Sequence, residues 1–153
     1  MRKEKRSILF VCTGNICRSP TAEGVLRDLS EKAGLELHIA SAGLGDWHIG
    51  QPPDERSQHH ARQRGYDLSA QRARQVTARD LEDFDMILAM DRGHLQALRK
   101  MAPPRHRAKI RLFHAELDVP DPYDGGVEGF EMVLDMVEAQ CRRLLQELKQ
   151  AIS

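Results

Sequence analysis

The chain has 153 residues, which is enough for one domain with one substantial core. Its apolar share of 41% excludes a disordered chain, and its formal net charge of +0 gives no reason to expect nucleic acid or an anionic membrane as a partner. The apolar runs are too short to span a bilayer, which needs about 20 such residues.

The predicted elements alternate between strands and helices along the chain. Residues 1–6 are expected to form a flexible tail, and residues 7–153 a single domain. Strands are predicted at 7–11, 37–41, 85–90 and 109–113. The first helix is predicted to run from an N-cap at Ser19 to a stop at Gly34, and three more are predicted at 54–65, 77–83 and 93–101. The last predicted helix has one apolar stripe, formed by Val127, Phe130, Leu134, Val137, Cys141, Leu144, Leu145 and Leu148.

This alternation predicts an α/β fold with right-handed crossovers. We expect a single three-layer domain, with a central, roughly four-stranded parallel sheet and helices on both faces. Active sites of such sheets lie beyond the carboxyl ends of the strands. Cys12 and Asp121 both fall in loops that follow predicted strands.

The segment joining the first strand to the first helix has the composition of a phosphate cradle. A tight loop at a helix N-terminus turns backbone N–H groups toward an anion. Gly14 permits close approach of the backbone, Asn15 tolerates left-handed torsions, and Arg18 offers a planar fork to two phosphate oxygens. The phosphate-binding candidates are Thr13, Gly14, Asn15, Ile16, Cys17, Arg18 and Ser19.

Cys12 lies at the base of this cradle. Positive surroundings that bind phosphate also stabilise a thiolate, which makes Cys12 the candidate nucleophile toward phosphorus. Ser19 can donate a hydrogen bond to that thiolate. Asp121 is the candidate proton donor to a departing phenolate, although Asp-Pro is by itself a common turn, and Asp118 and Asp124 are nearby rivals.

With these residues in place, the sequence resembles the low-molecular-weight protein tyrosine phosphatases over nearly its whole length. The resemblance is carried by VCTGNICRSP at 11–20, SAG at 41–43, ARQ at 73–75, FDMILAMD at 84–91, DPY at 121–123, and the last helix with Phe130, Val133 and Cys141. Two positions depart from many relatives: Gln71 stands where they have histidine, and Asp124 follows Tyr123 where some have a second tyrosine.

The resemblance implies hydrolysis of phosphotyrosine and aryl phosphates through a cysteinyl-phosphate intermediate, without metal or cofactor. Cys12 would be the nucleophile, Arg18 the phosphate clamp, and Asp121 the general acid and base. The resemblance also implies a hydrogen-bond network of Asn15, Ser19 and Ser41, and a pocket mouth lined by Trp47 and Tyr123. Expected partners are a phosphotyrosine-containing protein or a small aryl phosphate, with inorganic phosphate as product, and no nucleic acid or membrane.

Three other functions compete with this interpretation. A thiol-dependent arsenate reductase needs further mid-chain cysteines, whereas Cys141 is the only one after Cys17 and belongs to an apolar stripe. Relatives that act on phosphoarginine carry threonine at the position of Ile16. A non-catalytic phosphate-binding module would not need both Cys12 and Asp121.

The remaining polar candidates are interpreted conservatively. Three cysteines are too few for a disulfide framework, so we expect a reducing, cytoplasmic location. We also expect a monomer or weak dimer. No set of four ligands suggests a zinc site, and the resemblance makes a reversible Cys12–Cys17 disulfide the alternative use of Cys17. The histidines, including His59 and His60, are expected on solvated faces. The carboxylates of the last helix, Glu131, Asp135 and Glu138, are expected on its polar face.

Overall fold

A computed structural model describes residues 6–123 and 126–152 of the chain. Its strands are β1 (Arg6–Cys12), β2 (Leu37–Gly43), β3 (Met86–Ala89) and β4 (Ile110–Leu112). Its helices are α1 (Arg18–Lys32), α2 (Glu55–Gln63), α3 (Ala78–Asp83), α4 (Arg92–Met101), the 3-10 helix η1 (Pro104–Lys109) and α5 (Val127–Ile152).

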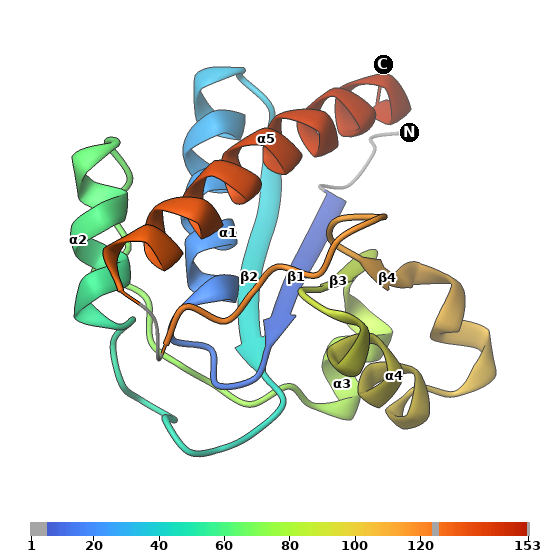
Figure 1. Cartoon of the computed structure of the whole chain (residues 1–153). Helices are drawn as coiled ribbons and strands as arrows, with labels where there is room; N and C mark the ends of the chain where they lie inside the picture. Colours follow the sequence, from blue (N-terminus) through green and yellow to red (C-terminus); the bar gives the residue numbers. More distant parts are fainter. Residues whose placement is uncertain (1–5, 124–125, 153) are drawn as a thin grey trace.

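The four strands form one parallel sheet in the order β2-β1-β3-β4 (Figure 1). Phe10 of β1 lies opposite Ser41 of β2, and Cys12 at the end of β1 lies opposite Gly43. Because all strands run in one direction, their carboxyl ends meet at one edge of the sheet. The loop that begins at Cys12 starts from this edge.

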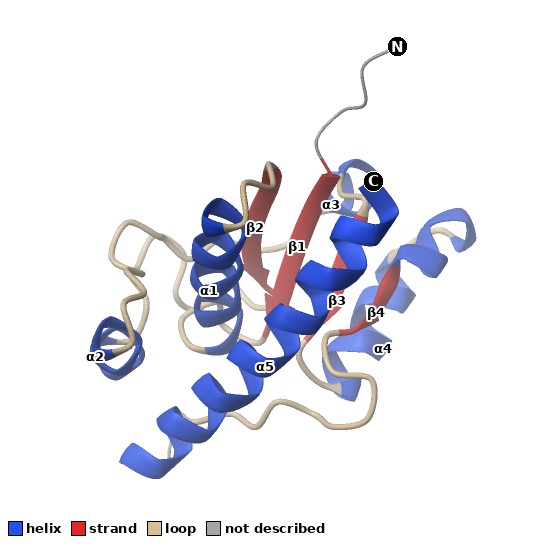
Figure 2. Cartoon of the chain, turned by 90° about the horizontal axis from the view of Figure 1, so that it is seen from above, coloured by secondary structure: helices blue, strands red, loops and turns tan. Residues whose placement is uncertain are grey.

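Helices cover both faces of the sheet, as Figure 2 shows, which confirms the predicted three-layer α/β fold. Side chains of β1 alternate between two apolar cores. Ile8 and Phe10 pack with α1 and α5, and Leu9 and Val11 pack with α3 and α4. A continuous apolar strand is needed here because both of its faces are buried.

Several boundaries and faces differ from the predictions. β1 begins at Arg6, the last residue of the range predicted as a tail, whose other five residues lie outside the described part of the chain. Helix α1 begins at Arg18, with Cys17 rather than Ser19 at the N-cap position, so the helix starts two residues earlier than its Ser-Pro signal predicts. Val127 is 66% exposed and so lies outside the buried stripe of α5.

Helix α2 is less exposed than its polar sequence predicts. His60 is buried, because it stacks on Phe130 and its Nδ1 contacts Glu131 of α5. The prediction of solvated histidines is therefore wrong for His60, and it is also wrong for His94 of α4, which is buried. No helix in residues 6–123 and 126–152 is long and apolar enough to cross a membrane.

Candidate active site

The loop between β1 and α1 brings the candidate nucleophile under the N-terminus of a helix. Cys12 Sγ lies 3.0 Å from Ser19 Oγ, and both side chains are buried. A serine hydroxyl can donate to a thiolate, so the predicted contact between these two residues is present.

Asn15 organises this loop from within. Its φ of +60° is in the left-handed region, which asparagine tolerates better than most residues. Its Nδ2 donates to Ser19 Oγ at 2.8 Å and to Ser41 Oγ at 2.9 Å, and its Oδ1 accepts from the backbone N–H of Arg74 at 3.0 Å. Ser41 in turn donates to Glu23 Oε1 at 2.6 Å. The three residues expected to support the loop therefore lie in one buried network.

The loop carbonyls are held on the outside of the turn. The carbonyls of Cys12 and Thr13 accept hydrogen bonds from the N–H groups of Leu44 and Gly45, and that of Ile16 accepts from Asp54. Gly43 is required at the end of β2, because a Cβ there would lie 3.0 Å from the carbonyl oxygen of Thr13. The loop thus packs backbone to backbone against the neighbouring strand.

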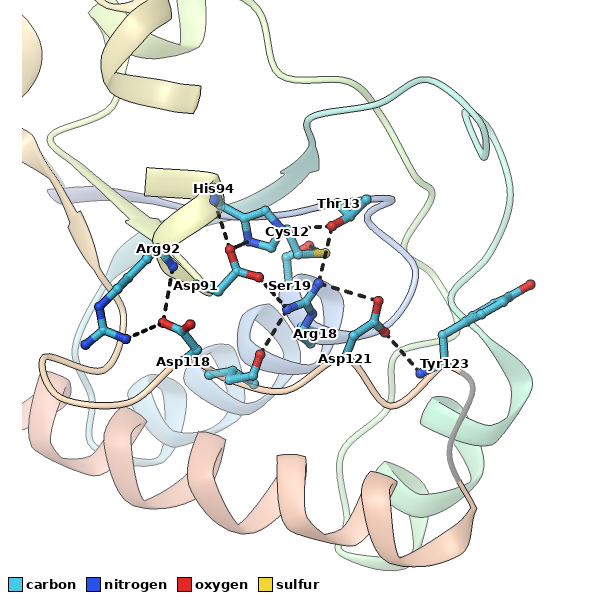
Figure 3. A network of polar contacts seen from close by, with 11 residues as sticks. Cys12, Thr13, Arg18, Ser19, Asp91, Arg92, His94, Asp118, Asp121 and Tyr123 are labelled. Atoms are coloured by element: carbon cyan, nitrogen blue, oxygen red, sulfur yellow. Dashed lines mark hydrogen bonds and ion pairs between the residues drawn. The ribbon is translucent and has the colours of Figure 1, made fainter. Parts of the chain in front are cut away.

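Arg18 is almost fully buried and is fixed by groups from three other segments (Figure 3). Its Nη1 donates to Asp91 Oδ2 at 3.0 Å and to the carbonyl of Val119 at 2.9 Å. Its Nη2 donates to Thr13 Oγ1 at 3.3 Å and lies 3.6 Å from Asp121 Oδ2. Because both Nη1 protons are engaged, Nε–H and one Nη2–H are the donors left for an oxyanion.

Asp121 lies at the same site but is exposed to solvent. Its side chain is 53% exposed, and its Oδ1 accepts a hydrogen bond from the N–H of Tyr123 at 3.0 Å. Of its two rivals, Asp118 forms an ion pair with Arg92 at 3.0 Å (Figure 3), and Asp124 lies outside the described residues.

A cavity of about 190 Å³ opens above the loop, and its lining includes Ile16, Arg18, Trp47, Asp121 and Tyr123. Trp47 and Tyr123 are 67% and 46% exposed, so both aromatic rings stand at the mouth of this cavity.

Tyr123 is held in place by Arg56 of α2. The guanidinium of Arg56 lies over the rings of Tyr123 and Phe130, with its carbon 5.5 Å and 4.8 Å from their centroids, and it donates to the Tyr123 carbonyl at 2.8 Å. It also pairs with Asp54 at 3.0 Å.

Cys17 belongs to the loop and lines the cavity, whereas Gln71 is not among the residues that line it. Burial raises the pKa of the Cys17 thiol to about 12, which keeps it protonated. Gln71 donates from Nε2 to the carbonyl of Pro20 at 3.0 Å, so it contacts the start of α1. No group of three or more His, Cys, Asp or Glu side chains within the described ranges is placed to hold a metal ion.

Three residues of the site were missed by sequence reasoning: Asp91, His94 and Arg56. Asp91 follows β3 at the carboxyl edge of the sheet, and this position and its place in a segment that carries the resemblance were the signals available for it. Burial alone would raise the pKa of Asp91, but the hydrogen bond from the His94 N–H, together with the hydrogen bond and charge of Arg18, holds it below its ordinary value. Nothing in the local sequence of His94 or Arg56 marked them.

Comparisons with known proteins agree with this geometry. The family model described as "Low molecular weight phosphotyrosine protein phosphatase" matches residues 7–153. The chain is 46% identical to the low molecular weight protein-tyrosine-phosphatase YfkJ of Bacillus subtilis over 151 residues, which cover 94% of this chain and 96% of the relative.

Two solved structures are also similar. A protein tyrosine phosphatase from Entamoeba histolytica superposes with a TM-score of 0.92 at 34% identity, over 97% of this chain and 100% of the other. Vibrio vulnificus Wzb, solved in complex with benzylphosphonate, superposes with a TM-score of 0.85 at 32% identity, over 94% and 99% of the two chains. The chain therefore belongs to the low molecular weight phosphotyrosine protein phosphatase family.

Proposed function

We propose that this chain hydrolyses phosphotyrosine and other aryl phosphates, with Cys12 as nucleophile, Arg18 as phosphate clamp and Asp121 as general acid and base. One observation carries the proposal. Cys12 Sγ lies 3.0 Å from Ser19 Oγ in the loop that also supplies Arg18, below a cavity lined by Asp121 and two aromatic rings.

In the first step, the Cys12 thiolate attacks phosphorus, the S–P bond forms, and the bond from phosphorus to the phenolic oxygen breaks. Asp121, as the acid, gives its proton to that oxygen, because a phenolate is a poor leaving group. Arg18 binds the equatorial oxygens through Nε–H and Nη2–H. The outward carbonyls of the loop support a role for its amides as further donors to the phosphate.

In the second step, a water molecule attacks the phosphorus of the cysteinyl phosphate, and the Asp121 carboxylate accepts its proton. The S–P bond breaks, inorganic phosphate forms, and the thiolate is stabilised by the Ser19 hydroxyl. Cys17 does not compete as a nucleophile, because burial keeps its thiol protonated.

The cavity supports an aryl substrate. Trp47 and Tyr123 offer two aromatic surfaces at the mouth, and Ile16 adds an apolar wall closer to the loop. The benzylphosphonate bound by Vibrio vulnificus Wzb combines the same two groups, a ring and a phosphoryl head. Phosphoarginine would instead bring a cationic guanidinium against Ile16.

The geometry of Cys141 weighs against an arsenate reductase. Its side chain is fully buried in α5, and its Sγ contacts the carbonyl of Ala22 at 3.9 Å. A resolving cysteine must reach the nucleophile, and Cys141 is packed inside the core.

Three further features belong to the proposal. Residues 7–153 act as one phosphatase domain, which is supported by two cores that share β1. The chain works in the cytoplasm, as the low, odd number of cysteines suggests. It acts as a monomer or a weak dimer on phosphotyrosine-containing proteins.

The test compares turnover of phosphotyrosine, phosphoserine and phosphoarginine peptides without added metal, for wild type and two variants. We expect Cys12→Ser to abolish turnover while still binding phosphate. Asp121→Asn should lower turnover of phenyl phosphates by about 10²–10⁴, and by less for esters whose leaving groups need no proton. Activity of Cys12→Ser within tenfold of wild type would remove Cys12 from the mechanism, and an equal loss for all leaving groups would make Asp121 structural.

A further inference from the structure

A buried histidine lies behind the phosphate clamp and has no part in the reaction described above. His94, in the first turn of α4, is 5% exposed. Its Nε2 lies 2.8 Å from Thr13 Oγ1, and its Nδ1 lies 3.3 Å from Asp91 Oδ1 (Figure 3). Thr13 is the residue after the proposed nucleophile, and Asp91 holds Arg18. His94 therefore touches two of the groups that contact the guanidinium, Thr13 and Asp91.

These contacts close a ring of four side chains. Arg18 Nη1 donates to Asp91 Oδ2, Asp91 Oδ1 faces His94 Nδ1, His94 Nε2 meets Thr13 Oγ1, and Thr13 Oγ1 accepts from Arg18 Nη2. Figure 3 shows the imidazole on the side of the guanidinium that lies away from Tyr123. The ring joins the loop after β1, the start of α1 and the start of α4.

The chemistry of the neighbours decides which imidazole nitrogen carries the proton. Within the described residues Nδ1 makes no hydrogen bond, but it lies 3.3 Å from Oδ1 of Asp91, a carboxylate that can only accept and whose negative charge favours a proton on that side. The proton therefore belongs on Nδ1, and Nε2 is left as an acceptor. Thr13 must then donate its hydroxyl proton to Nε2, which turns the oxygen lone pairs toward Arg18 Nη2.

This arrangement requires a neutral imidazole. Burial holds the pKa of His94 below its ordinary value, against the opposing effect of the Asp91 carboxylate. The charged groups that act on the ring are Asp91, Arg18, Asp121 and Asp118. The ring is therefore neutral at neutral pH, and its Nε2 lone pair is available.

We propose that His94 is a positioning residue that fixes the Thr13 hydroxyl and, through that hydroxyl, the orientation of Arg18 in the phosphate site. One Nη2 proton is committed to Thr13, so the other, together with Nε–H, is aimed at the oxyanion. Without His94, the Thr13 hydroxyl is free to rotate, and Arg18 Nη2 loses a fixed acceptor, whereas Asp91 keeps its hydrogen bonds from the His94 backbone N–H and from Arg18. The inference rests on the proposed function only in assigning Arg18 to phosphate.

The experiment is a double-mutant cycle read by calorimetric binding of inorganic phosphate, with phenyl phosphate turnover measured in parallel. The variants are Thr13→Val, His94→Leu and the two combined, with His59→Gln as control because His59 is exposed on α2. We expect each single variant to weaken phosphate binding about tenfold, the effect of one hydrogen bond that aligns a charged group. The phosphate affinity of the combined variant should be within about twofold of the affinity of Thr13→Val alone, because His94 acts through Thr13.

If His94 had a merely structural role, the tenfold decreases in phosphate affinity of the two single variants would multiply, and the combined variant would bind phosphate about 100-fold more weakly than wild type. That result, or unchanged phosphate binding in His94→Leu, would overturn the inference. Because phosphate binding is measured without turnover, a wild type that binds phosphate with this coupling but does not hydrolyse phosphotyrosine would overturn the proposed function and leave the inference standing.

Two further measurements keep the inference testable where His94→Leu does not fold. His94→Gln can place an acceptor near the position of Nε2, so its affinity for phosphate should stay within about threefold of wild type. The shorter side chain of His94→Asn reaches only toward Asp91, so this variant should bind phosphate about tenfold more weakly than wild type. The reverse order would overturn the role of Thr13. In the wild type, nitrogen chemical shifts should show the proton of His94 on Nδ1, and a proton on Nε2 would contradict the mechanism.

Discussion

Substitution of Asn15 is the sharpest test of how the phosphate loop is held. Asn15→Ala removes three hydrogen bonds, to Ser19, Ser41 and the N–H of Arg74, whose partners lie in a buried network. At about 1 kcal/mol net for each bond, the loss is about 3 kcal/mol of unfolding free energy. Alanine must also adopt the φ of +60°, which costs about 1 kcal/mol more.

A matched variant separates these two contributions. Asn15→Gly loses the same hydrogen bonds but adopts a positive φ without strain, so we expect it to lose about 3 kcal/mol where Asn15→Ala loses about 4. Urea denaturation measures both values, and kcat/KM for phenyl phosphate should fall in the same order. Equal stabilities of the two variants would refute the backbone argument. Values within about 0.5 kcal/mol of wild type would show that the network does not hold the loop.

Three more predictions concern the pocket walls and the α2–α5 contact. Trp47→Ala should lower kcat/KM for aryl phosphates by about 1–2 kcal/mol and leave phosphate binding unchanged; weaker phosphate binding would contradict its place at the mouth. Arg56→Met should raise KM for the same substrates by about threefold to tenfold, because the Tyr123 carbonyl and ring lose their support, and Arg56→Lys should rescue little. Burial alone would raise the pKa of Glu138, but hydrogen bonds from Tyr66 and Arg64 hold this pKa below its ordinary value of 4.5. The ionised Glu138 carboxylate therefore stabilises the fold at pH values above 4.5, and this stabilisation is lost as the pH falls through the folded-state pKa. Glu138→Gln should have a lower unfolding free energy than wild type at neutral pH, and that free energy should fall less on acidification, as measured by urea titrations. Parallel pH profiles of wild type and variant would refute this.

The parts of the fold and site that follow from the sequence are those that depend on neighbouring residues. The apolar run of β1 predicts a strand buried on both faces, and residues 12–19 predict an anion-binding turn before a helix. The position of Asn15 at positive φ also follows from residue type. In each case the determinants lie within one turn or one strand, where backbone sterics and side-chain chemistry act locally.

The contacts that were missed join residues far apart in the chain. Thr13 and His94 are 81 residues apart, and Arg18 donates to the carbonyl of Val119 across 101 residues. A backbone carbonyl leaves no mark in the sequence, because every residue has one. His60 was assigned to solvent because its own helix is polar, whereas its burial depends on Phe130 and Glu131 of α5.

The polar contact between α2 and α5 also bears on the shape of the pocket. Helix α2 has few apolar residues, and its C-terminal side is held by Arg64, which pairs with Glu131 and Glu138 of α5 at 2.6 Å each. The loop carrying Trp47 leads into α2, and the segment carrying Tyr123 leads into α5. Because each wall of the pocket is attached to one of these two helices, the ion pairs between the helices constrain the separation of the walls. We therefore expect substitutions at Arg64 to alter KM for aryl substrates before they alter phosphate binding, since the phosphate loop is held independently through Asn15.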